Sequence, residues 1–228
     1  MKFKLENTHS FYQKTEKEKK AIQFKVVTIA LLLFIPSLIV AWQTKIFFIA
    51  IFVFYLLIMI IAPFIDVPTN QKTGKLIYYS NFLITEKEKN GVVKIHGGTL
   101  LDYYFVLNFK WNGQQRTNFI LQQYLEGLLN LIETYENGEN KRVKFTGTTY
   151  ILNARTAEKL GFKTRKIDSV QLLILSMNYF ILLTSNSMAK RKLAFPNLRK
   201  AISFEANLED LIEKKILIKT LSDRLNKF

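Results

Sequence analysis

Residues 46–65 read IFFIAIFVFYLLIMIIAPFI, twenty positions without a charged side chain. Because a helix rises about 1.5 Å per residue, this stretch reaches roughly the 30 Å thickness of a bilayer's hydrocarbon core. Each Leu, Ile, Phe or Val near the centre of such a helix favours insertion by about 0.3–0.6 kcal/mol. The stretch therefore predicts a membrane-spanning helix.

A second apolar run lies just upstream, at residues 26–42, VVTIALLLFIPSLIVAW. Its length is at the short end for a span, and Pro36 is tolerated when a neighbouring helix helps to satisfy the freed backbone groups. Only residues 43–45 separate the two runs, so together they predict an antiparallel transmembrane hairpin over residues 26–65. The alternative is a pair of buried helices in a soluble protein, but few soluble helices are apolar on every face.

The lysines set the expected orientation of this hairpin. Residues 1–25 carry seven lysines against three glutamates, whereas the link between the two runs carries only Lys45. The positive-inside rule then places both chain termini in the cytosol. The absence of cysteine fits that reducing compartment. We therefore expect a two-pass protein of a bacterial inner membrane.

The rest of the chain predicts a cytosolic α+β domain at residues 75–228. A linker at residues 66–74, DVPTNQKTG, is expected to join it to the hairpin, and residues 1–25 form a basic cytosolic segment. Apolar alternation predicts strands, and an apolar stripe with a period near 3.6 predicts helices. Strands are expected at 76–85, 92–95, 102–111 and 142–152, and helices from near Thr117 to Gly138, at 154–160, and in a tail helix capped by Asn207. This order predicts an antiparallel or mixed sheet packed by helices.

Residues 170–185, VQLLILSMNYFILLTS, leave several interpretations open. The segment is apolar but contains Gln171, Ser176 and Asn178, and it fits a buried helix, two strands, or a helix lying on the membrane. A third span is disfavoured by the length, by those polar residues and by the basic cluster that follows at 190–192.

Composition excludes several classes of site. A chain without cysteine has no disulfide scaffold and no thiolate metal site, and two histidines cannot build a multi-histidine metal site. Residues 144–150, KFTGTTY, lack the G-K-S/T of a phosphate-binding loop. Residues 157–163, AEKLGFK, are similar to the last helix-to-strand step of the GNAT acetyltransferases, but the glycine loop that binds acetyl-CoA in that family has no match here. We expect no metal and no cofactor.

The stretch IHGGTLLDYY at residues 95–104 holds the candidate ligand-binding residues. Paired glycines suit a tight turn or bulge, and they also let a backbone approach a phosphate. In the catalytic interpretation His96 acts as a base that Asp102 orients, which requires the glycines to fold the chain back, because an extended strand would hold the two side chains ~20 Å apart. The predicted ligand-binding residues are His96, Gly97, Gly98, Thr99, Asp102 and Arg155, and no residue is assigned a catalytic role.

Most of the net charge of +15 lies in one block. Residues 141–200 hold thirteen basic side chains against Glu158 and Asp168. Near anionic lipid each Lys or Arg contributes about 1 kcal/mol to membrane attraction, which favours a lipid-facing patch. A solvated face or a nucleic-acid surface are the alternatives, and nucleic acid is disfavoured because the domain is tethered to a bilayer. The predicted membrane-surface residues are Lys163, Arg165, Lys166, Lys190, Arg191, Lys192, Arg199 and Lys200.

These patterns support three hypotheses about function. The first is a membrane-anchored sensing or docking module whose basic face meets anionic lipid headgroups. The second is a membrane-tethered enzyme that acts on a lipid-linked or phosphate-bearing substrate through His96 and Thr99. The third is an effector whose hairpin oligomerises and permeabilises the membrane. A protein partner or a small phosphate-bearing ligand fits the first two hypotheses.

Overall fold

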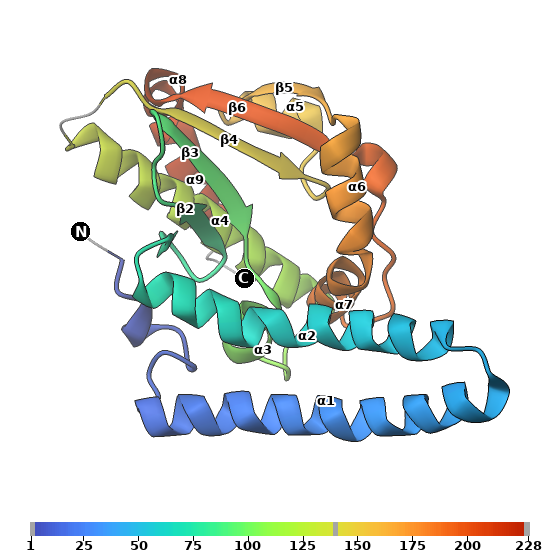
Figure 1. The fold of residues 1–228 in the computed structure, drawn as a ribbon. Coiled ribbons are helices and arrows are strands. Elements are labelled where there is room, and N and C mark those ends of the chain that lie inside the picture. Colours follow the sequence, from blue (N-terminus) through green and yellow to red (C-terminus); the bar gives the residue numbers. More distant parts are fainter. Residues whose placement is uncertain (1–2, 139–140, 226–228) are drawn as a thin grey trace.

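The computed structural model describes residues 3–138 and 141–225, and it begins with the two long apolar helices. Helices α1 (Glu16–Thr44) and α2 (Phe48–Lys72) pack side by side as an antiparallel pair, as the sequence predicts (Figure 1). The two helices are the only ones in the described ranges that are long and apolar enough on their own to cross a membrane. Helix α1 starts earlier than its apolar run, because Thr15 and Glu18 form a reciprocal capping box inside the basic segment.

The predicted linker is the first difference from expectation. Helix α2 continues to Lys72 through most of residues 66–74, despite Pro68 and the turn-forming residues around it. Phe64 and Val67 on its last turns are buried against Leu5, Phe11 and the start of the domain. This burial outweighs the local turn preference, so the hairpin is joined to the domain by a packed helix.

The domain contains one mixed sheet with the strand order β1-β2-β3-β4-β6-β5. Only β3 and β4 run parallel to each other, and the other neighbours are antiparallel. The strands are β1 (Leu76–Tyr78), β2 (Leu83–Glu86), β3 (Val92–Gly97), β4 (Lys144–Thr149), β5 (Lys163–Lys166) and β6 (Ile202–Asn207). The helices are α3 (Leu100–Val106), α4 (Gly113–Glu136), α5 (Ala154–Lys159), α6 (Ser169–Met177), α7 (Tyr179–Lys190), α8 (Leu208–Glu213) and α9 (Lys215–Leu225), with short 3-10 turns η1 (Leu5–Asn7) and η2 (Leu198–Lys200). The α+β class with a mixed sheet is confirmed.

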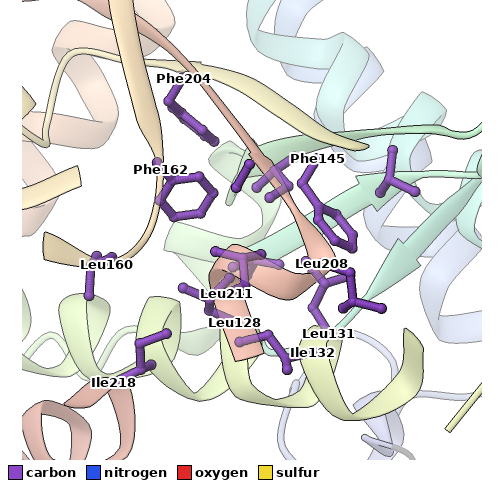
Figure 2. Packing of buried hydrophobic residues seen from close by; sticks show 14 of the residues in the cluster. Leu128, Leu131, Ile132, Phe145, Leu160, Phe162, Phe204, Leu208, Leu211 and Ile218 are labelled. Atoms are coloured by element: carbon purple, nitrogen blue, oxygen red, sulfur yellow. The ribbon is translucent and has the colours of Figure 1, made fainter. Parts of the chain in front are cut away.

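The main core lies between one face of the sheet and helices α4, α8 and α9. Figure 2 shows Phe145 and Phe204 from the sheet facing Leu128 and Leu131 of α4 and Leu211 of α8. Phe162 stacks edge-on against Phe204 at a ring distance of 4.8 Å and brings the α5–β5 unit into the same core. The opposite face is covered only in part, by α2 and the N-terminal segment over Tyr78 and Ile84 and by Gln171 of α6 over Ser203.

The strand predicted at 102–111 is wrong, because residues 100–106 form helix α3. Thr99 and Asp102 make a capping box, with the Asp102 carboxylate accepting from the Thr99 backbone and hydroxyl at 2.6 and 2.8 Å. A T-x-x-D box starts a helix, and here it overrides the alternation of aromatic residues that suggested a strand. Asn112 likewise caps α4, with its side chain accepting the backbone N–H of Gln115.

The C-terminal half mixes confirmed and missed elements. The helix predicted at 154–160 is present as α5, which Asn153 caps and after which Gly161 adopts a positive φ of 94°. The box formed by Asn207 and Asp210 starts the tail helix, but the helix breaks after Glu213. Strands β5 and β6 were not predicted, because three of the four residues of β5 are charged and β6 pairs only with strands that are distant in sequence. Residues 170–185 form neither strands nor a buried helix, since they lie in α6 and α7, which are bent by 67°.

Gly127 offers a test of the close contact between α4 and the sheet. An added Cβ at Gly127 would lie 2.5 Å from Leu83 Cβ and 2.6 Å from Ser80 Oγ. Alanine improves helix propensity by about 1 kcal/mol, whereas overpacking typically costs about 1–3 kcal/mol. We therefore expect Gly127→Ala to lower the melting temperature in mild detergent by roughly 2–4 °C per kcal/mol lost. A rise in melting temperature would show that the helix and sheet are packed less closely than described.

Candidate functional site

Asp102 lies at the centre of a buried polar cluster in the first turn of α3. Besides Thr99, its carboxylate accepts a hydrogen bond from the Tyr78 hydroxyl at 2.8 Å and one from His9 Nε2 at 3.1 Å. The side chains of His9 and Asp102 are completely buried. Four donors therefore surround one carboxylate, which satisfies the charge that burial would otherwise penalise.

His9 connects this cluster to the N-terminal segment. Its Nδ1 accepts the backbone N–H of Phe11 at 3.3 Å, so Nδ1 carries no proton and Nε2 is the nitrogen that donates to Asp102. Phe11 is fully buried next to it, and Thr8 donates to the Asn81 side chain at 3.0 Å. The segment before α1 is thereby fixed to β1, α3 and the last turns of α2.

This buried cluster has a structural role. A base needs access to a substrate proton, and neither His9 nor Asp102 is exposed. Burial, and secondly the nearby Asp102 charge, raises the pKa of Tyr78, so its hydroxyl stays a proton donor to Asp102. The role of His9 could not be predicted from a local pattern, because 93 residues separate it from Asp102. The residues that follow it, Ser10, Phe11 and Tyr12, do not indicate this contact.

The structure does not bring His96 and Asp102 together. His96 is on β3 opposite Ile84, its side chain is about half exposed, and its Nε2 lies 3.0 Å from Glu86 Oε1. Lys94 on the same strand lies 3.6 Å from the other oxygen of Glu86. The base–orienter pair that the catalytic hypothesis requires is therefore absent, because Asp102 is occupied by His9 instead.

Gly97 and Gly98 have a steric role at this point. A Cβ on Gly97 would lie 2.5 Å from the Tyr124 hydroxyl, and one on Gly98 would lie 2.5 Å from the ring of buried Phe82. Both glycines therefore allow β3 to turn into α3 directly over α4 and β2. Thr99, the next residue, is used as the N-cap of α3.

Two of the predicted residues, His96 and Arg165, lie on the sheet face opposite the main core. Arg165, Ser203 and Thr148 are in register on β5, β6 and β4, and His96 follows Ile95, which pairs with Gly147. Strand alternation therefore points His96 and Arg165 to the same face, three strands apart, roughly 14 Å. In the neighbouring row Glu205 lies 2.9 Å from Lys144, and this ammonium lowers the pKa of the Glu205 carboxyl.

The remaining predicted residues lie elsewhere. Arg155 is exposed on α5 and shares no described contact with His96 or Asp102. The basic residues gather at both ends of the α6–α7 pair. Lys163, Arg165 and Lys166 are in β5 just before α6, Lys190–Lys192 end and follow α7, and Arg199 and Lys200 form η2, which lies against α6.

Arg116 is a buried basic residue that sequence analysis did not single out. Its guanidinium donates to the backbone carbonyls of Met188 and Phe109 at 2.7 Å each, and its Nε donates to Trp111 O at 3.1 Å. It thereby ties the end of α7 to the start of α4. A guanidinium suits this role because its fixed fork serves several carbonyls at once.

Apolar side chains dominate the exposed surface of the hairpin and of α6. Leu32 and Phe48 are more than 60% exposed, although both lie within the apolar runs. Large exposed apolar patches mark membrane or protein contacts. Among residues 3–138 and 141–225, no group of three His, Asp or Glu side chains is placed to hold a metal ion.

Comparison with family models, curated proteins and solved structures finds no match to the chain.

The buried cluster gives a prediction with an internal control, because the chain has two histidines. His9→Ala removes a hydrogen bond to a buried carboxylate and leaves a cavity, so we expect a loss of about 2–3 kcal/mol in the free energy of unfolding. The N-terminal segment should also become cleavable by trypsin after Lys14. His96→Ala removes only an exposed pair and should change stability by less than about 0.5 kcal/mol. Equal melting temperatures for the two variants in mild detergent would contradict this role of His9.

Proposed function

We propose that the protein is a two-pass protein of a bacterial inner membrane that holds a sensing or docking domain on the cytosolic surface, with basic side chains toward anionic lipid. The observation that carries the proposal is the exposure of the hairpin. Residues 26–65 present large apolar side chains on nearly all sides, and the domain covers only part of α2. Water is a poor solvent for such a surface, whereas acyl chains suit it.

The way the domain is held supports a docking role. The start of α1 and the end of α2 are held together at the domain end of the hairpin, because Lys72 Nζ lies 3.7 Å from Glu16 Oε2 and Gln23 donates to Phe64 O at 2.9 Å. The N-terminal segment and α3 pack against the same turns of α2. The domain therefore has a defined orientation relative to the hairpin, which a module that presents one face to the membrane requires.

The charge distribution fits this orientation. Lys190–Lys192, Arg199 and Lys200 are at the ends of α6 and α7, whose bend contacts the apolar part of α2. Basic residues next to apolar helices are typical of the cytosolic headgroup layer. The lipid partner in this proposal is an anionic phospholipid headgroup.

Membrane residence is tested by extraction. We expect the full chain to stay in the membrane pellet after an alkaline carbonate wash. Arginine near the centre of a span costs about 2.5–3.5 kcal/mol, so the double variant Leu32→Arg, Ile58→Arg should be released or degraded. The control Ile216→Arg, Leu217→Arg adds the same charge to exposed apolar positions on α9 and should stay in the pellet. Recovery of the unmodified chain in the detergent-free supernatant would refute the proposal.

Orientation is tested with single cysteines, because the chain has none of its own. Lys45→Cys lies in the link between α1 and α2, and Lys89→Cys lies in the exposed turn between β2 and β3. In spheroplasts a membrane-impermeant maleimide should label the first and spare the second until the cells are lysed. The reverse pattern would place the domain outside the cytosol.

A further inference from the structure

The α6–α7 pair is an uncharged segment that the proposed two-span topology does not use. Residues 169–189, SVQLLILSMNYFILLTSNSMA, contain no charged side chain. They form two helices bent by 67° at Asn178. Asp168 and Lys166 precede the segment and Lys190, Arg191 and Lys192 follow it, so charges bracket it at both ends.

Helix α6 has no buried residue. In a soluble domain a nine-residue helix normally buries an apolar stripe, but here the apolar side chains face outward. The exposed ones are Val170, Leu172, Leu173, Ile174 and Met177, and Phe180 follows at the start of α7. Leu193 and Phe195, between Lys192 and η2, are also more than 60% exposed. In water this whole apolar surface would have no apolar partner.

The polar side chains of the segment are satisfied internally. Ser176 donates to Leu172 O, Asn178 to Ile174 O and Thr184 to Phe180 O, each at 2.8 Å. Such i−4 bonds let a polar side chain enter an apolar medium, where an unpaired polar group would cost several kcal/mol. Near the start of α6, Gln171 accepts from the hydroxyls of Thr148 and Ser203. The bend is therefore compatible with hydrocarbon.

The bend touches α2 inside its apolar run. The Tyr55 hydroxyl donates to Met177 O, and the rings of Phe52 and Phe180 lie 6.0 Å apart, edge to face. Phe52 is thirteen residues from Ile65, the end of that run, which is ~20 Å along the helix axis. If residues 46–65 cross the bilayer, the bend lies well below the membrane surface.

Both ends of the segment return to the domain, so it does not cross. The start of α6 is attached to β4 and β6 through Gln171. The end of α7 lies against the start of α4, where a Cβ on Gly113 would be 2.3 Å from Lys190 O. Figure 1 shows α7 next to α2, and α6 running from α7 toward the sheet. Both flanks are therefore attached to the domain, away from the bend.

We propose that α6 and α7 form a re-entrant element that enters the bilayer from the cytosolic side beside α2, with Leu193 and Phe195 at the interface and the flanking lysines and arginines at the headgroups. Its partner is the acyl region of a bilayer that contains anionic lipid. This inference rests on the proposed membrane residence of the hairpin. It adds a third membrane-contacting segment to the two helices of the hairpin, and it predicts that the domain is partly embedded in the bilayer.

Depth-dependent quenching tests the proposal in the full-length chain, again because single cysteines can be introduced without background. Leu173→Cys and Met177→Cys report on α6, Ile51→Cys reports on α2, and Ile216→Cys is a matched exposed apolar position on α9. Each variant is labelled with an environment-sensitive fluorophore and reconstituted into phosphatidylcholine–phosphatidylglycerol vesicles that carry nitroxides on the acyl chains. We expect labels at 173, 177 and 51 to lose most of their emission and the label at 216 to keep it.

The outcomes separate the two proposals. Quenching at 51 with residues 173 and 177 behaving like 216 would overturn the re-entrant element and leave the hairpin in the membrane. Unquenched labels at all four positions would overturn both. Labelling of Met177→Cys by an impermeant maleimide on the same side as Lys45→Cys would mean that the segment crosses the bilayer, which also overturns a re-entrant element.

Discussion

Helix α2 lies in two environments: its end is buried in the protein core, and its start has an exposed apolar surface. The rest of the structure depends on where along the helix one gives way to the other. Its last turns are buried against the N-terminal segment, β1 and α3, whereas its first turns pack beside α1 and, at Phe52 and Tyr55, contact the α6–α7 bend. One rigid helix thus passes from a protein core to a surface that water solvates poorly. Because a helix rises about 1.5 Å per residue, the position of this change sets how far the domain stands from the hydrocarbon.

Asp102 fixes the protein side of that boundary. It joins three segments distant in sequence: the N-terminal segment through His9, β1 through Tyr78, and α3 through Thr99. A buried carboxylate is stable only while its donors remain, so these segments are held as a unit. Since the N-terminal segment leads directly into α1 and β1 follows α2, the unit clamps both helices of the hairpin where they leave the domain. The hairpin and the domain therefore form one body.

The sequence was sufficient wherever a pattern was local. The apolar runs, the Asn153 and Asn207 caps and the α4 stripe all depend on residues within a few positions of one another, and the structure contains each of them. The failures are of two kinds. At residues 102–111 two local signals competed, and the Thr99–Asp102 box prevailed over alternation. At His9 and at β6 the decisive partners are far away in sequence, so no local pattern could indicate them.

The predicted ligand residues are close together in the sequence but lie in different parts of the folded domain. Strand alternation sends His96 to the open sheet face, while the box sends Asp102 into the core. That open face is nevertheless linked to the membrane side, because Gln171 of α6 binds Thr148 and Ser203, the row that also contains Arg165. A helix in the leaflet would thus contact the sheet through two hydroxyl groups. Such a link carries a signal only if α6 has two arrangements whose balance the bilayer shifts, and this is the physical requirement that a sensing role places on the protein.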